Sequence, residues 1–206
     1  GVESSLSKLL NLSEVFCNGV FCHPESVLPN SIFVEISEFL HAASWERSEV
    51  GLEEAIAAGC RLVVGPRRPK GLTEWIEVEN GRRALADLCR SFCGARADGL
   101  KVIGVTGTNG KTTVSFLVSS LLNRLGERWG RIGTLGAELD GEIDAGSGFT
   151  TPLAPELWER FAEFRDQVAD GVAIEASSHG IELDRVHGIS WSGLVFTNLG
   201  SDHLDF

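Results

Sequence analysis

The sequence predicts an α/β protein in two parts, a small amino-terminal α/β domain at residues 1–97 and the first part of a mostly parallel-sheet domain at residues 98–206. Apolar strand candidates alternate with helical patterns along the chain, which is the order of elements in parallel α/β layers. The strand candidates in the second part are continuous apolar runs, as expected for strands covered by helices on both faces. A glycine-rich turn joins one of these strands to a helix at residues 106–113.

The first part contains strand and helix candidates in alternation. In chain order they are an amphipathic segment at 6–16, a strand at 31–36, a helix at 52–58, a strand at 61–64 and a helix at 82–93. Gly59 follows the first of these helices, and glycine readily adopts the left-handed conformation that closes a helix.

The second part begins after a division near residues 95–99. Its candidates are strands at 100–105, 171–175 and 194–197 and a helix at 113–125. The carboxyl ends of parallel strands lie along one rim of a sheet, where the ligands of open α/β folds bind. We therefore expect polar residues that follow these strands to form the functional site.

Composition and charge exclude several classes of protein. The chain has 206 residues, 43% of them hydrophobic, and a formal net charge of −11. An acidic balance argues against a nucleic-acid surface or an anionic membrane surface, because both require basic patches. No apolar run approaches the roughly 20 residues that a membrane span needs. We expect no membrane insertion and no nucleic-acid partner.

The five cysteines indicate reduced thiols and a cytoplasmic location, because their number is odd and their spacing forms no compact disulfide framework. Cys89 and Cys93 are four residues apart on a helical pattern and share one face. A metal site there lacks a second Cys/His pair nearby, so buried thiols are the favoured interpretation.

The turn at residues 106–113 has the composition of a P-loop that holds a nucleotide phosphate. Its candidate cofactor-binding residues are Gly107, Thr108, Asn109, Gly110, Lys111, Thr112 and Thr113. Small residues let successive N–H groups point at phosphate oxygens, Lys111 supplies a mobile charge, and the Thr112 hydroxyl suits Mg²⁺. Val105 stands where the strict pattern has glycine. We expect an ATP site; the alternative is a chance glycine turn before a helix.

The sequence motif Thr-Gly-Thr-Asn-Gly-Lys-Thr-Thr at 106–113 resembles the phosphate-loop motif of the Mur ligase superfamily. The members of this superfamily are the ATP-dependent amide ligases of peptidoglycan precursor synthesis. Further blocks look like its MurE branch, the UDP-N-acetylmuramoyl-dipeptide ligases that add the third stem residue. They are Thr-Thr-Pro at 150–152, Glu-Ala-Ser-Ser-His-Gly at 175–180, Arg-Val at 185–186, Phe-Thr-Asn-Leu at 196–199 and Asp-His-Leu-Asp-Phe at 202–206. These motifs follow one another in the same order as in the family and span the second half of the chain.

The resemblance assigns roles at these positions. It implies Lys111, Glu175 and His203 as catalytic residues, with Thr112, Glu175 and His203 at the metal. It implies that Thr150, Thr151, Ser177 and Arg185 contact the muramoyl-peptide substrate. From the residues alone, Glu175 is also readable as a capping or solvated acid, and His203 as a structural histidine.

Other interpretations of these side chains stay open. Thr151 before Pro152, with Glu156 following, is a helix-start signal. An alternative interpretation of Arg185 is that it forms a surface salt bridge with Asp184 or Glu182. A hydrolase reading of the residues around Ser177 is disfavoured, because adjacent residues rarely hold nucleophile–base geometry and no Gly-x-Ser-x-Gly elbow is present.

The first part matches the MurE pattern only loosely. Val27, Pro29 and residues 32–34 keep its framework, but residues 21–25 replace the hydroxyl-rich, cationic uridine loop with apolar and acidic residues. Glu25 stands at the arginine position and would oppose an approaching nucleotide-sugar. Trp45 is available to stack on a base, although a core tryptophan is the more frequent role.

The resemblance implies an amide ligase that uses ATP and Mg²⁺, with UDP-MurNAc-dipeptide and an amino acid as substrates and an acyl-phosphate intermediate. It also implies that residues 1–97 correspond to the UDP-precursor domain and residues 98–206 to an incomplete central ATP-binding domain. We expect a monomeric amino-terminal piece, inactive alone. The alternatives are a binding module without turnover, or a ligase of the MurF or folylpolyglutamate-synthase type.

Overall fold

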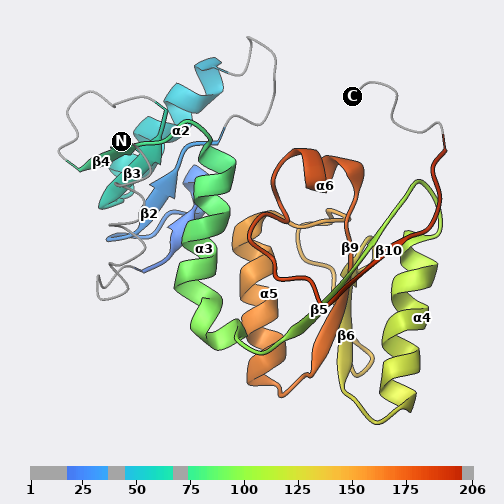
Figure 1. Cartoon of the computed structure of the whole chain (residues 1–206). Helices are drawn as coiled ribbons and strands as arrows, with labels where there is room; N and C mark the ends of the chain where they lie inside the picture. The colour runs from blue at the N-terminus through green and yellow to red at the C-terminus, as the bar shows by residue number, and fades with distance from the viewer. Residues whose placement is uncertain (1–17, 37–44, 67–73, 201–206) are drawn as a thin grey trace. The chain divides into compact units, whose positions relative to one another are not determined.

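The computed structural model describes residues 18–36, 45–66 and 74–200. The chain forms two compact units, residues 1–92 and 93–206, and each is considered by itself below (Figure 1). The sequence division near residues 95–99 falls close to this boundary, which lies inside helix α3 (Gly81–Ala97).

The first unit contains a four-stranded parallel sheet in the order β1-β2-β3-β4. Its strands are β1 (Val20–Phe21), β2 (Ile32–Val34), β3 (Leu62–Gly65) and β4 (Trp75–Glu77). Helix α2 (Trp45–Ala57) and the 3-10 turn η1 (Pro24–Ser26) accompany them. Val27, Phe33, Ala55 and Val63 form a buried apolar cluster within this unit.

The predicted elements of the first unit are confirmed where the structure describes them. Strand β2 lies within the predicted range 31–36, and strand β3 overlaps the predicted range 61–64 and extends one residue beyond it. Helix α2 starts at Trp45 and is longer than predicted, while Gly59 after it has a positive φ of 87°. Strands β1 and β4 were not predicted, because two or three residues carry too little periodicity to be recognised. The amphipathic segment at 6–16 lies outside the described residues.

The second unit contains a six-stranded mixed sheet in the order β10-β5-β9-β6-β7-β8. Its strands are β5 (Lys101–Thr106), β6 (Trp129–Gly133), β7 (Gly136–Leu139), β8 (Glu142–Asp144), β9 (Gly171–Glu175) and β10 (Gly193–Phe196). The first four strands in this spatial order pair in parallel, and β7 and β8 continue the sheet antiparallel. The mostly parallel sheet that the sequence predicts is therefore present.

Helices cover both faces of this sheet. Helix α4 (Lys111–Arg124) and helix α5 (Ala154–Asp166) lie on opposite faces, and the short α6 (Ser178–Glu182) follows β9 (Figure 1). Strand β9 is buried along its whole length, which explains its continuous apolar sequence. Ser115 and Ser119 are buried on α4, where their small side chains let the helix approach the sheet closely. Within the described residues, no helix is long and apolar enough to cross a membrane.

Strands β6, β7 and β8 were not predicted. A signal for β7 and β8 exists in the dipeptide Asp140-Gly141, whose φ angles of 54° and 89° are those of a two-residue turn of type I′. This turn joins β7 to β8 and requires residues that tolerate positive φ, as aspartate and glycine do. The polar composition of the flanking strands hid them from a search for apolar runs.

Candidate functional site

The phosphate loop connects the carboxyl end of β5 to the start of α4. Gly110 precedes the helix in the left-handed region, with φ 86°, and Lys111 is the first helical residue. A Cβ atom on Gly107 would lie 2.2 Å from Thr197 Oγ1, so only glycine fits there. The predicted strand–turn–helix arrangement is confirmed, and the amides of the first helical turn have no intrahelical acceptor.

The far side of the loop is fixed by the segment that follows β10. Asn198 Oδ1 accepts from the Asn109 amide at 3.1 Å, and Asn198 Nδ2 donates to the Asn109 carbonyl at 3.0 Å. Thr197 Oγ1 donates to the same carbonyl at 2.7 Å, and the Thr108 amide donates to the Asn198 carbonyl at 3.0 Å. Because the amides of Thr108 and Asn109 are used in this way, the amides that begin α4 are the ones placed for a phosphate.

Lys111 folds back over the loop. Its Nζ donates to the carbonyl oxygens of Gly107 at 2.7 Å and of Thr108 at 3.0 Å. The ammonium group therefore lies within the concavity where a phosphate would be held, and its stem reaches there from the first turn of α4.

Glu175 is the central acid of the site. It ends β9, and only 2% of its surface is exposed. Oε2 accepts from Thr112 Oγ1 at 2.9 Å and from Thr134 Oγ1 at 3.1 Å, while Oε1 accepts from the Thr134 amide at 3.2 Å. Gly133 leaves the space that the carboxylate occupies, because a Cβ on it would lie 2.0 Å from Oε1. A buried carboxylate beside two hydroxyls is a set of hard oxygen ligands suited to Mg²⁺.

Thr134 was missed by the sequence analysis. It directly follows β6, so its side chain lies on the same rim as Glu175, one strand away. Recognition of β6 would have pointed to it, because polar residues after parallel strands gather at this rim.

The helix-start signal around Thr151 is confirmed, because helix α5 begins three residues later, but Thr151 is not the cap of that helix. Helix α5 begins at Ala154 after Leu153, with no side-chain cap and with proline in its first turn. Thr151 is fully buried instead; its hydroxyl donates to the Glu175 carbonyl at 2.8 Å and accepts from the Ser177 amide at 3.0 Å. Ser177 in turn caps α6, because its hydroxyl accepts from the Gly180 amide at 3.1 Å. Thr151 thus joins the start of α5 to the end of β9.

Arg185 extends over the same region. Its Nη1 donates to the Thr151 carbonyl at 2.9 Å, and its guanidinium carbon lies 4.5 Å from the centre of the Phe149 ring. This geometry is a cation–π contact. Phe149 was also missed by the sequence analysis, since a lone aromatic residue in a glycine-rich loop has no distinguishing pattern.

The loop that carries Phe149 and Thr150 is tied to α5. Glu156 accepts from the Ser147 amide at 3.1 Å, and Arg160 donates to Asp144 at 2.5 Å. The Gly146 amide and then Arg160 hold the pKa of Asp144 below its usual value. These contacts keep the loop beside Glu175, where the Thr150 hydroxyl lies 3.1 Å from that of Thr134.

The structure therefore brings most of the predicted site residues together. One network of hydrogen bonds includes Thr112, Thr150, Thr151, Glu175, Ser177 and Arg185. His203 lies outside the described residues, as does the side chain of Trp45. Within residues 18–36, 45–66 and 74–200, no group of three or more His, Cys, Asp and Glu side chains is placed to hold a metal ion.

The chain is similar to several known proteins. Residues 105–206 match the Mur ligase middle domain. The chain is 40% identical over 193 residues to the UDP-N-acetylmuramyl-tripeptide synthetase of Deinococcus radiodurans, with 91% of this chain and 38% of that protein covered. It is 39% identical over 191 residues to the UDP-N-acetylmuramoyl-L-alanyl-D-glutamate--2,6-diaminopimelate ligase of Chlorobaculum tepidum, with 91% and 36% covered.

A solved structure shows the same fold. A UDP-N-acetylmuramoyl-L-alanyl-D-glutamate--2,6-diaminopimelate ligase superposes with a TM-score of 0.79 at 28% identity, over 91% of this chain and 37% of that chain. The chain thus spans little more than a third of the length of the curated relatives above, 38% and 36%.

Proposed function

Because this chain belongs to the Mur ligases, we propose that it forms part of a MurE-type, ATP-dependent amide ligase of peptidoglycan synthesis. The ligase would add the third stem amino acid to UDP-MurNAc-dipeptide. The names of the relatives above support this reaction class. The observation that carries it in this chain is the contact of Thr112 with the buried Glu175 beside the phosphate loop.

The proposed reaction proceeds in two steps. The γ-phosphoryl group of ATP passes to the precursor carboxylate and gives an acyl phosphate and ADP. The amine of the incoming amino acid then attacks the acyl carbon, and inorganic phosphate leaves from the tetrahedral intermediate. The phosphate is a far better leaving group than oxide, which makes amide formation possible.

Residues of the phosphate loop would act mainly by positioning and by charge. Lys111, released from the carbonyls of Gly107 and Thr108, would stabilise the charge that shifts onto the phosphoryl oxygens. The amides of Gly110 and of the first turn of α4 would hold the phosphate in line with the attacking carboxylate.

Mg²⁺ fits the residues beside the loop. Thr112 and Glu175 offer oxygen ligands within hydrogen-bond distance of each other, and His203 is proposed from its motif as a further ligand. The ion, when bound, would neutralise part of the negative charge of the reacting groups. Glu175 is suited to hold it because its carboxylate is buried and already oriented by donors.

The precursor would occupy the other side of Glu175. Thr150 and Arg185 provide a hydroxyl and a guanidinium group for its anionic groups. Thr151 and Ser177 would contribute through the backbone that they hold in place. Residues 1–97 would correspond to the UDP-precursor domain and residues 98–206 to the ATP-binding domain. We further propose a monomer that acts in the cytoplasm.

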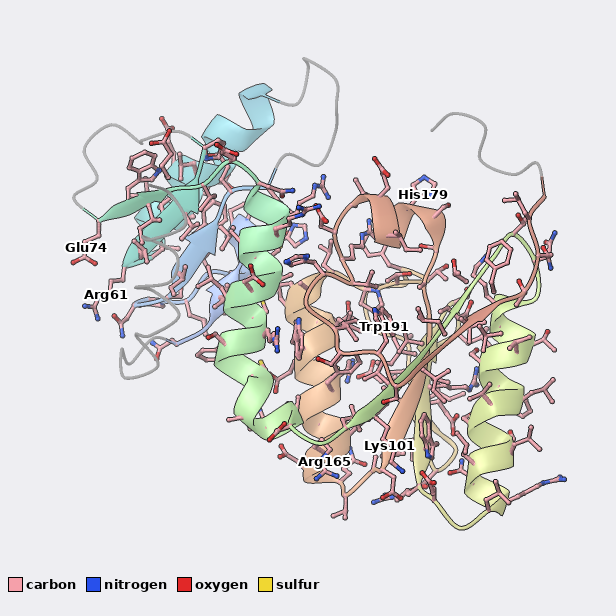
Figure 2. The ribbon with its side chains drawn as sticks, viewed as in Figure 1. Arg61, Glu74, Lys101, Arg165, His179 and Trp191 are labelled. Carbon is pink, nitrogen blue, oxygen red and sulfur yellow. The ribbon has the colours of Figure 1, made fainter. Side chains whose placement is uncertain are left out.

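Calorimetry with a non-hydrolysable ATP analogue and Mg²⁺ tests this proposal. Lys111→Ala should weaken binding by at least about tenfold, because hydrogen bonds from charged donors contribute about 1.5–3 kcal/mol. The matched control is Lys101→Ala. Lys101 is paired with Glu127 at 2.9 Å and lies at the end of the sheet opposite to His179 and α6 (Figure 2).

Equal binding by wild type and Lys111→Ala would contradict the proposal, as would equal losses in both lysine variants. If the analogue binds as expected, UDP-MurNAc-dipeptide is titrated next. In the intact protein, ATP turnover that survives Lys111→Ala would also exclude the assigned role of this lysine.

A further inference from the structure

The direction of each hydrogen bond around Glu175 can be deduced from proton counting. The hydroxyls of Thr112 and Thr134 both donate their protons to the Glu175 side-chain oxygen Oε2. Thr134 has a single hydroxyl proton, and this bond uses it. The contact of 3.1 Å between the hydroxyls of Thr134 and Thr150 therefore requires Thr150 to be the donor.

These bonds form a directed chain, in which Thr150 donates to Thr134 and Thr134 donates to Glu175. Thr112 donates to the same Glu175 oxygen, Oε2. The chain connects the loop before α5 to the first turn of α4 through the ends of β6 and β9. Thr134 is its central member and supplies two of the three bonds that Glu175 accepts from these threonines, one from its amide and one from its hydroxyl.

We propose that Thr134 is a positioning residue that orients the Glu175 carboxylate and couples the precursor side of the site to the phosphate loop. The inference rests on the proposed function for the identity of the two ligands. A precursor group that accepts the Thr150 proton would compete with Thr134 for it. Occupation of the precursor side would thereby change the hydrogen bonding of Glu175, and thermodynamic linkage makes that effect reciprocal.

Thr134 can be replaced to test this role. Thr134 is exposed, so its replacement leaves no buried cavity. Thr134→Val keeps the branched shape and the backbone amide and removes only the hydroxyl. Thr134→Ser keeps the hydroxyl. Leu135→Ala alters the adjacent side chain, which is 57% exposed, and serves as the matched control.

The first measurement is the affinity of the ATP analogue with Mg²⁺. Thr134→Val should bind about tenfold more weakly than wild type, since hydrogen bonds to charged groups are stronger than neutral ones. Thr134→Ser should stay within about twofold of wild type, and Leu135→Ala should be unchanged. Wild-type affinity in Thr134→Val would overturn the positioning role, and so would an equal loss in Thr134→Ser.

The second measurement is a double-mutant cycle in urea unfolding of the unliganded chain, with Thr134→Val, Thr150→Val and the pair. Thr150→Val should lower the urea midpoint in the wild-type background and cause no further loss in the Thr134→Val background. Additive losses would overturn the directed chain. Because this cycle needs no ligand, it tests the hydrogen-bond chain on which the inference rests even if wild type fails to bind nucleotide, which would contradict only the proposed function.

Discussion

Arg185 lies over the face of Phe149, with 4.5 Å between the guanidinium carbon and the ring centre. The aromatic ring comes from the loop before α5, and the arginine follows α6, so the contact joins two segments that border Glu175. The ring limits the positions that the guanidinium can adopt while Nη1 bonds to the Thr151 carbonyl. Phe149 itself remains 46% exposed, so a ligand can reach the same surface.

Phe149→Ala should therefore weaken precursor binding. Loss of a cation–π contact of about 0.5–1 kcal/mol predicts an affinity for the proposed substrate, UDP-MurNAc-dipeptide, lower by about twofold to fivefold. Nucleotide affinity should be unchanged. Ile143→Ala, at a comparably exposed position on β8, is the control for loss of apolar surface. Calorimetry with the precursor checks the prediction, which fails if both variants lose the same affinity.

Gly133→Ala should disrupt the Glu175 carboxylate. The new Cβ would lie 2.0 Å from Oε1 and 2.4 Å from Cδ, so the carboxylate must leave its donors. We expect a loss of stability of about 1–3 kcal/mol from overpacking and at least about tenfold weaker binding of the ATP analogue with Mg²⁺. In Gly193→Ala the new Cβ lies 3.7 Å from its nearest neighbour, an ordinary contact. Equal behaviour of the two variants would refute the prediction.

Thr151→Val should destabilise the second unit. The valine keeps the shape of the fully buried threonine but leaves the Ser177 amide and the Glu175 carbonyl without their hydroxyl partner. Unmade hydrogen bonds of this kind predict a decrease of about 1–3 kcal/mol in the free energy of unfolding in urea. Thr113→Val, on the exposed side of α4, should change it by less than about 0.5 kcal/mol.

The buried thiol of Cys93 should make the free energy of unfolding decrease at alkaline pH. Burial and then the charge of Glu159 raise the pKa of this thiol from 9.0 to about 12. Between these two pH values the unfolded chain releases the thiol proton and the folded chain keeps it. Stability is therefore fully present below pH 9 and falls as pH rises, by at most about 1.4 kcal/mol per pH unit from this group.

Urea unfolding at a series of pH values from 8 to 11, compared with Cys93→Ala, isolates this contribution. The variant should lose less stability than wild type over the alkaline range. Parallel curves for the two proteins would show that Cys93 ionises in the folded state as it does in the unfolded chain.

Local sequence was sufficient for the phosphate loop and for the elements that flank it. The apolar run ending at Val105, the glycines at 107 and 110 and the helix from Lys111 are defined by neighbours in the chain. Glu175 was found in the same way, because it directly follows the continuous apolar residues of β9. Such features depend on backbone conformation and periodicity, which a short segment carries by itself.

Tertiary structure decided which side chains meet Glu175. Thr134, Thr150 and Thr112 are far apart in the chain and converge only because β5, β9 and β6 are neighbours in the sheet. The same strand order placed Thr151 against the end of β9, although its local signal indicated a helix cap. Hydroxyl groups such as these form hydrogen bonds equally well with local or distant partners. The sequence therefore determined the phosphate loop and Glu175. Only the packing of the strands determined the polar network that orients the Glu175 carboxylate beside the loop.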